Sequence, residues 1–177
     1  TIGIMMADAA FLPIDIRTPE NRIRLMIDNS KCSAVITDNV YVKEDNRIVK
    51  IDELFKQQRN CDIELNYTIT SENQLSYVIF TSGSTGKPKG TMIEFQGMKN
   101  HIQEKIKLLK LDDNCTLAYN ASIGFDISIW QMLTPIIVGS RMVIFSDLDV
   151  LNISTFCKKL IQNKVTHLEV VPMYLNL

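Results

Sequence analysis

The stretch Tyr77–Gly90, "YVIFTSGSTGKPKG", joins a run of apolar strand-forming residues to ten residues made almost wholly of Gly, Ser, Thr, Lys and Pro. Such a loop offers backbone N–H groups, hydroxyls and little side-chain bulk, which suits the close approach of a phosphate. Surface turns also use small polar residues. Four hydroxyls, three glycines and two lysines directly behind an apolar strand nevertheless favour phosphate binding.

The loop does not match the Walker pattern of nucleotide-binding proteins. That pattern, GxxxxGK[ST], requires Gly at position 81 and Ser or Thr at position 88. This chain has Thr81 and Pro88 at these positions. The sequence therefore predicts a phosphate-binding loop of another type.

Strands and helices alternate along the rest of the chain. Short apolar runs predict strands, and apolar residues at helical spacing predict helices. This order predicts an α/β layered fold with parallel strands joined by right-handed crossovers. The polar stretch 60–72 gives a candidate internal boundary near 60–74. Strands are expected in 32–38, 75–81, 91–95, 115–120, 141–145 and 166–172, helices in 18–31, 96–109, 125–139 and 154–163, and one of each in 46–55.

Composition excludes several classes of protein. With 177 residues, 46% of them hydrophobic, the chain fits one domain or part of a larger one. Lys plus Arg (19) nearly balances Asp plus Glu (20), so no basic field would recruit nucleic acid or an anionic membrane. The four cysteines form no CxxC pair, which favours thiols without a metal or redox task. No signal peptide precedes them, so we expect a cytoplasmic protein.

Three motifs resemble one enzyme family. "LSYVIFTSGSTGKPKG" resembles the phosphate-loop motif of the adenylate-forming, AMP-binding enzymes. "MMADAAFLPIDIRTPENRIRLMIDNS" and "FDISIW" resemble segments of the adenylation domains of nonribosomal peptide synthetases. The resemblance runs from Met5 to Tyr174 and departs at Phe95, where the family often has His. It implies that residues 1–177 are part of the large N-terminal subdomain of an adenylation domain, with that fold incomplete in this chain.

The resemblance implies a two-step chemistry. The substrate carboxylate attacks the α-phosphorus of ATP, which gives an aminoacyl adenylate and pyrophosphate, and the aminoacyl group then passes to the phosphopantetheine thiol of a peptidyl carrier protein domain. Mg²⁺ is expected with most of its ligands outside this chain, and some such domains also need a small activator protein. Lys89 is the expected catalytic cation, whereas Lys87 occupies a variable position. The expected phosphate cradle consists of Thr81, Ser82, Gly83, Ser84, Thr85 and Gly86.

Asp126 has two interpretations from its position before an apolar helix. As an N-cap it would stabilise the helix by about 1 kcal/mol. The family motif instead assigns this carboxylate to the α-ammonium of the substrate, a charge-assisted contact, and the two roles can coexist. Ile127 and Trp130 are three residues apart and share a helix face, so they either line the same pocket or pack in an ordinary core.

Glu169 is the candidate residue that bears on substrate choice. In the expected strand "THLEVVP" it shares a face with His167 and Val171. The resemblance places Glu169 at a specificity-pocket position, where a carboxylate would pair with a basic side chain because a buried unpaired charge is costly. The hypothesis is a cationic amino acid such as 2,4-diaminobutyrate or ornithine.

Two alternatives remain open. The first is an acyl- or aryl-CoA ligase of the same superfamily, although a substrate without an α-ammonium gains nothing from Asp126. The second is a noncatalytic fragment that binds nucleotide or serves as a scaffold. Since the family's ribose-binding Asp and C-terminal catalytic Lys would lie beyond Leu177, we expect the 177-residue chain alone not to complete adenylation.

Overall fold

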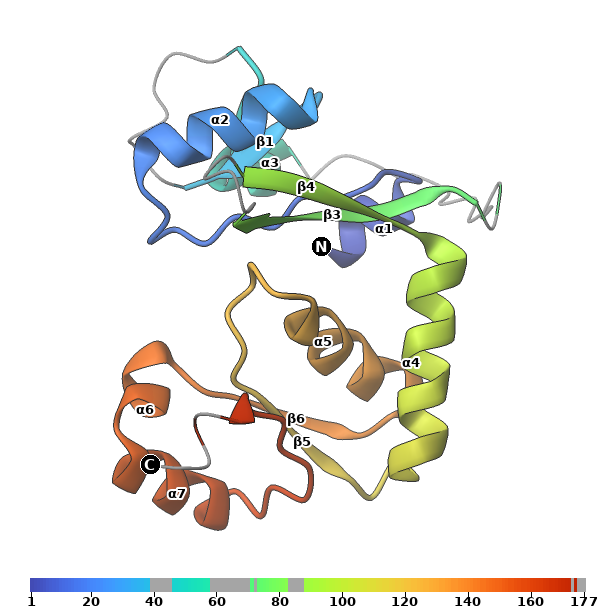
Figure 1. Ribbon diagram of the computed structural model, residues 1–177, viewed down its shortest axis with the longest axis vertical. Coiled ribbons are helices and arrows are strands. Elements are labelled where there is room, and N and C mark those ends of the chain that lie inside the picture. Colours follow the sequence, from blue (N-terminus) through green and yellow to red (C-terminus); the bar gives the residue numbers. More distant parts are fainter. Residues whose placement is uncertain (39–45, 58–70, 72, 83–87, 173, 175–177) are drawn as a thin grey trace. The chain divides into compact units, whose positions relative to one another are not determined.

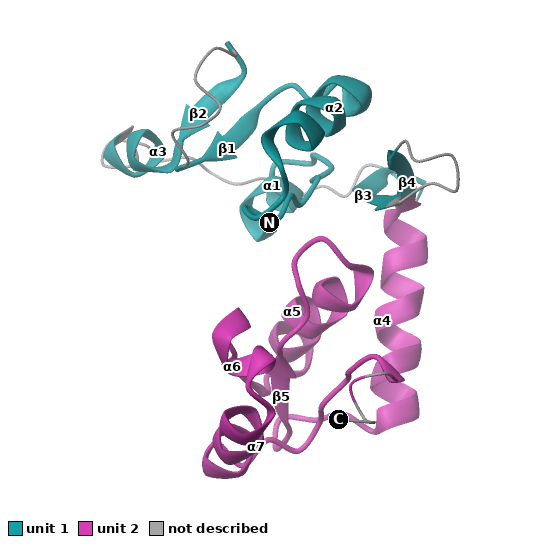
Figure 2. Ribbon diagram, turned by 60° about the vertical axis from the view of Figure 1, so that its left-hand side comes forward, with its two compact units in different colours: residues 1–92 teal, residues 93–177 magenta. Residues whose placement is uncertain are grey.

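The computed structural model describes residues 1–38, 46–57, 71, 73–82, 88–172 and 174 (Figure 1). These residues form two compact units, Thr1–Met92 and Ile93–Leu177 (Figure 2). Most of 60–74 lies outside the described residues, so the boundary expected there stays a prediction. Among the described residues, no helix has the length and apolar character needed to span a bilayer.

Among its described residues, the first unit contains two separate pairs of strands, whose labels can be followed in Figure 2. One pair is parallel, with Val35 opposite Ile48. Phe11 forms a parallel bridge with Tyr77, in which Phe11 N donates to Ser76 O at 3.2 Å and Val78 N donates to Phe11 O at 3.0 Å. The elements are α1 (Ile2–Met6), α2 (Glu20–Ser30), β1 (Val35–Thr37), β2 (Ile48–Lys50), α3 (Ile51–Gln57), β3 (Leu75–Ser82) and β4 (Pro88–Glu94).

The second unit contains a βαβ motif. Two parallel strands are paired in register, with Leu117 opposite Met142. Leu117 also forms a parallel bridge with His167, so the strand that carries Leu117 is flanked on both sides. This confirms the predicted α/β class and its parallel pairing. The elements are α4 (Phe95–Leu109), β5 (Thr116–Tyr119), α5 (Asp126–Val138), β6 (Arg141–Ile144), α6 (Asp147–Leu151) and α7 (Ile153–Gln162).

An aromatic core lies under α7. Phe156, from α7, is 1% exposed and packs with Ala118 and Phe145. The ring of Phe156 meets that of Phe145 edge-on at 4.9 Å and that of Tyr174 at 5.9 Å. Since Leu117 is fully buried and points to the opposite face of β5 from Ala118, apolar residues cover both faces of this strand.

The stretch 166–172 is not the strand that its apolar pattern predicted. His167 alone forms a bridge, and residues 168–171 have no regular structure. A longer parallel pairing would need Asn120 N to donate to Glu169 O, but Asn120 N donates to Gln131 Oε1 at 3.1 Å, and side-chain amides approach Glu169 O instead. Asn120 Nδ2 donates to Glu169 O at 3.1 Å, and Gln131 Nε2 lies 3.5 Å from the same oxygen.

Gly139 ends α5 in the left-handed conformation, with φ of 73°. An added Cβ would meet nothing nearer than Asp113 Cβ at 4.0 Å, so only the backbone conformation penalises a side chain. We expect Gly139→Ala to lower the free energy of unfolding by about 1 kcal/mol. Gly97→Ala, inside α4, is the matched control and should raise it by about 0.5–1 kcal/mol. Urea unfolding measures both, and equal shifts of one sign would contradict the argument.

Asp149 joins α6 to α7. It closes a capping box with Ser146, and its Oδ1 accepts a hydrogen bond from Lys159 Nζ at 2.5 Å. The bonds from Lys159 and Ser146 hold the pKa of Asp149 below its ordinary value of 3.8. Because the folded-state pKa is depressed, this carboxylate stabilises the fold above its unfolded-state pKa, and the contribution is lost as pH falls.

Asp149→Asn is therefore expected to flatten the pH dependence of stability at acid pH. Its free energy of unfolding should fall less steeply than that of the wild type as pH drops below about 4. Lys159→Met removes the partner and should flatten the same region. Urea midpoints recorded at a series of pH values measure this effect, and parallel pH profiles for all three proteins would contradict it.

Candidate functional site

The predicted phosphate loop lies between two paired strands. Thr81 and Ser82 end β3, and Lys89 is the second residue of β4, so this lysine belongs to a strand and not to the loop itself. Thr81 and Lys89 are both exposed. The remaining cradle residues, Gly83, Ser84, Thr85 and Gly86, lie outside the described residues. The strand–loop–strand arrangement is the one that the sequence predicted.

Gly90 explains how closely β4 approaches β3. A Cβ at this position would lie 3.1 Å from Val78 Cγ1 and 3.2 Å from Phe80 Cζ. These distances are shorter than ordinary van der Waals contacts, so a side chain at this position would require the Val78 and Phe80 side chains to shift. Gly90, the third glycine of the motif, thus allows close packing between β4 and the side chains of β3.

Asp126 is the first residue of α5. Phe125 occupies the N-cap position without a side-chain cap bond, so the expectation of an N-cap at Asp126 is wrong by one residue. Asp126 Oδ1 accepts a hydrogen bond from Ile127 N at 2.9 Å. The carboxylate is exposed, and its Oδ2 accepts no hydrogen bond from any described residue of its unit. One oxygen is therefore available to a ligand.

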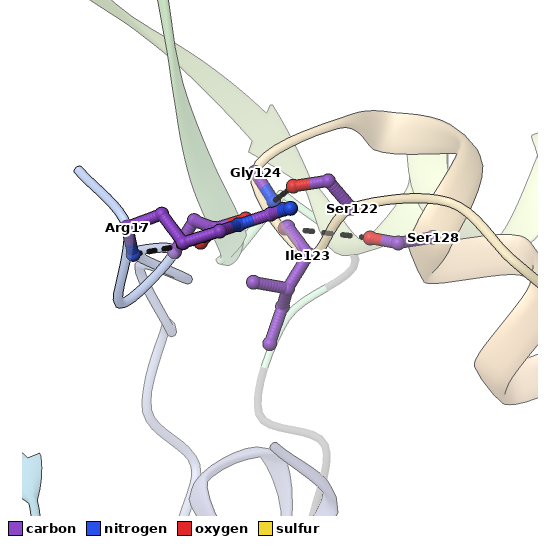
Figure 3. A network of polar contacts seen from close by, with 6 residues as sticks. Arg17, Ser122, Ile123, Gly124 and Ser128 are labelled. Atoms are coloured by element: carbon purple, nitrogen blue, oxygen red, sulfur yellow. Dashed lines mark hydrogen bonds and ion pairs between the residues drawn. The ribbon is translucent and has the colours of Figure 1, made fainter. Parts of the chain in front are cut away.

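The buried hydroxyl of Ser128 contacts the turn that precedes α5 (Figure 3). Ser128, which is 1% exposed, donates through Oγ to Phe125 O at 2.6 Å and also lies 3.4 Å from Ile123 O. Gly124 N donates to Ser122 Oγ at 3.4 Å. The two Ser128 contacts tie the turn to the first helical turn of α5, which begins at Asp126.

Gln131 anchors the other end of the same turn. This side chain is fully buried, and its Oε1 accepts hydrogen bonds from Asn120 N and Ala121 N, both at 3.1 Å. Its Nε2 donates to Asn120 Oδ1 at 3.2 Å. Sequence reasoning missed Gln131, although an amide in the middle of so apolar a helix was a usable signal, because buried polar groups are normally paired.

A second missed residue, Lys105, contacts two of the predicted pocket residues. Its Nζ lies 2.6 Å from Glu169 Oε2 and 4.7 Å from the centroid of the Trp130 ring. Trp130 is 3% exposed, and among the described residues its Nε1–H finds no acceptor. Ile127 is half-buried on the same face of α5 as Trp130. The available signal for Lys105 was its place next to Ile106, beside the apolar stripe of its helix.

The structure thus brings part of the predicted site together. Asp126, Ile127 and Trp130 follow one another on α5, and Lys105 links Trp130 to Glu169. The phosphate-loop residues belong to the other unit. The described residues contain no cluster of three or more His, Cys, Asp or Glu side chains that could hold a metal ion.

The family model for AMP-binding enzymes matches residues 1–177. The chain therefore belongs to the AMP-binding enzyme family, as its motifs predicted. It is 33% identical over 178 residues to tyrocidine synthase 2 of Brevibacillus parabrevis, covering 98% of this chain and 5% of that protein. It is 29% identical over 180 residues to bacitracin synthase 3 of Bacillus licheniformis, covering 99% of this chain and 3% of that protein.

Solved structures of nonribosomal peptide synthetases share the fold. The AMPPNP-bound form of FmoA3 superposes with a TM-score of 0.80 at 21% identity, over 98% of this chain and 18% of that one. An artificially fused adenylation–PCP di-domain, NpsA-ThdA from Klebsiella oxytoca, superposes with a TM-score of 0.78 at 20% identity, over 93% of this chain and 33% of that one. The chain thus spans a small part of the relatives that it matches.

Proposed function

We propose that this chain serves the ATP-dependent activation of an amino acid as an aminoacyl adenylate, which is then loaded onto the thiol of a peptidyl carrier protein domain. The observation that carries the proposal is the exposed carboxylate of Asp126, of which only Oδ1 is bound within the described residues of its unit. In a chain of the AMP-binding family, this carboxylate stands at the start of α5 with Oδ2 unused by the described residues of its unit. An α-ammonium is the substrate group that such an oxygen binds best, through a charge-assisted hydrogen bond.

The strand pair β3–β4 and its loop would bind the phosphates of ATP. Thr81 and Ser82 end one strand, Lys89 is the second residue of the other, and the sequence between them supplies glycines and hydroxyls. Backbone N–H groups and a lysine would stabilise the charge that develops on the departing pyrophosphate. Mg²⁺ would add to this stabilisation, and FmoA3, a protein of the same fold, binds the ATP analogue AMPPNP.

Glu169 supports the narrower hypothesis of a basic amino acid such as 2,4-diaminobutyrate or ornithine. Its carboxylate is half-buried and accepts a hydrogen bond from the ammonium of Lys105. The contact indicates that a cation is stable at this place. A basic substrate side chain would then compete with Lys105 for the same carboxylate.

The test is amino-acid-dependent ATP–pyrophosphate exchange by the product of the full open reading frame that encodes this chain. The panel should contain basic, neutral and acidic amino acids together with matched carboxylic acids that lack the amino group. We expect exchange with amino acids, led by ornithine or 2,4-diaminobutyrate. Exchange only with the acids that lack an amino group would move the protein to the acyl-ligase branch and refute the role of Asp126.

Loading is tested separately with a phosphopantetheinylated carrier domain. We expect radiolabelled amino acid to become attached to the carrier only in the presence of ATP and Mg²⁺. The similarity to the adenylation–PCP fusion supports this partner. Activation without transfer to any carrier domain would leave the first half of the proposal standing and refute the second.

A further inference from the structure

The ammonium group of Lys105 binds one carboxylate oxygen of Glu169. Lys105 Nζ lies 2.6 Å from Glu169 Oε2, and the same ammonium stands over the ring of Trp130 at 4.7 Å from its centroid. Lys105 comes from α4, Trp130 from α5, and Glu169 from the segment after α7. Three separate elements of the second unit therefore meet at a single ammonium group.

The burial of this pair distinguishes it from ordinary surface ion pairs. The side chains of Lys105 and Glu169 are 24% and 31% exposed, whereas those of the neighbouring pair Lys107 and Glu104 are 70% and 61% exposed. A half-buried carboxylate that loses its partner becomes an uncompensated charge, which is unfavourable. A cation therefore stabilises Glu169, and in the structure Lys105 supplies it.

We propose that Lys105 is a specificity-determining residue of the amino-acid site: it is the internal counter-ion of Glu169, and a basic substrate side chain binds by taking its place. The inference rests on the amino-acid activation proposed above. A substrate ammonium that pairs with Oε2 would compete with Lys105 Nζ for that oxygen, because two ammonium groups brought close together repel each other. Lysine is suited to leave, since its stem is flexible and its ammonium is strongly hydrated.

The replacement of Lys105 by a substrate ammonium at Glu169 limits the preference for basic over neutral amino acids. When a basic substrate enters, Glu169 gains one ion pair and loses another, so the net gain over a neutral substrate is small. Without Lys105, the free protein would hold Glu169 unpaired, and a basic substrate alone would restore the pair. Removal of Lys105 should therefore sharpen the preference for basic amino acids.

The test compares ornithine with norvaline, which has the same carbon chain without the side-chain ammonium. The ratio of their kcat/KM values in ATP–pyrophosphate exchange is measured on the product of the full open reading frame, and calorimetric titration of both amino acids gives a readout that does not depend on turnover. Lys105→Met keeps the stem over Trp130 and removes the charge. We expect the ornithine-to-norvaline ratio to rise about tenfold or more.

Three further variants serve as controls for the expected change in the ornithine-to-norvaline ratio. Lys105→Arg keeps the counter-ion and should leave the ratio within about threefold of the wild type. Lys107→Met removes a lysine two residues away, whose exposed pair contributes little, and should not change the ratio. Glu169→Gln removes the negative charge but keeps an accepting oxygen, and it should lower the ratio about tenfold, which tests the same pair from its other side.

The outcomes separate the two proposals. Absence of amino-acid-dependent exchange in the wild type refutes the proposed function itself. Exchange with a ratio that is the same in the wild type and in Lys105→Met overturns only the counter-ion role and leaves the pair as a structural contact. If Lys105→Met does not fold, Lys105→Gln and Glu169→Gln decide the question, and an unchanged ratio in both overturns the inference.

Discussion

Asp126→Asn is expected to lower kcat/KM for amino-acid-dependent ATP–pyrophosphate exchange about 100-fold, which corresponds to about 2.7 kcal/mol of lost transition-state stabilisation. The substitution keeps the size of the side chain and the oxygen that accepts the bond from Ile127 N. It removes the charge that would pair with the α-ammonium of the substrate. Hydrogen bonds to charged groups are the stronger class, and the ammonium would be left without its counter-ion.

Asp147→Asn is the matched control. Asp147 is the first residue of α6, as Asp126 is of α5, so the same change of charge is made at the same helical position. We expect its kcat/KM to stay within about threefold of the wild type. Equal losses in both variants would show that the effect comes from helix stability, and an Asp126→Asn protein with normal exchange would remove the central support for amino-acid activation.

Gln131→Met is expected to lower the free energy of unfolding by about 2–5 kcal/mol. The Gln131 side chain is fully buried, and its Oε1 binds two backbone N–H groups of the turn that follows β5, those of Asn120 and Ala121. Methionine has a similar volume but cannot accept these bonds, so both donors would be left without a partner. An unsatisfied buried donor costs about 1–3 kcal/mol.

Thr134→Val supplies the comparison on the same helix. Thr134 is also fully buried, but its Oγ1 has no hydrogen-bond partner among the described residues. Loss of this hydroxyl should change stability by less than about 1 kcal/mol or raise it slightly. Urea unfolding of the purified chain measures both variants. A Gln131→Met protein as stable as Thr134→Val would mean that water replaces the lost amide and that the network is not essential.

Gln131→Met should also impair exchange with every amino acid to a similar degree. The turn that Gln131 holds leads into Asp126, and its Nε2 lies near the backbone oxygen of Glu169. A shift of this turn moves the contact to the α-ammonium, which all amino acids share. This pattern contrasts with Lys105→Met, for which the ranking of substrates is expected to change.

The candidate site was predictable in part. The motif that contains Asp126, Ile127 and Trp130 and the loop before β4 could be recognised because each is a continuous stretch with an unusual composition. Gln131 carried a usable signal as an amide in an apolar helix, whereas Lys105 escaped because its importance depends on a residue far along the chain. Lys105 meets Glu169 across 64 positions, and no local pattern encodes such a contact.

Local sequence therefore determined the elements of this protein and their class. Helices α2, α4, α5 and α7 form where apolar residues recur at helical spacing, and α5 ends at Gly139 because glycine adopts the left-handed conformation without strain. Only the tertiary structure decided that the described residues of 166–172 form a single bridge, because the buried Gln131 side chain binds the Asn120 N–H that a longer pairing would use. It also decided that Glu169 meets Lys105, because a half-buried carboxylate takes the cation that packing brings within reach.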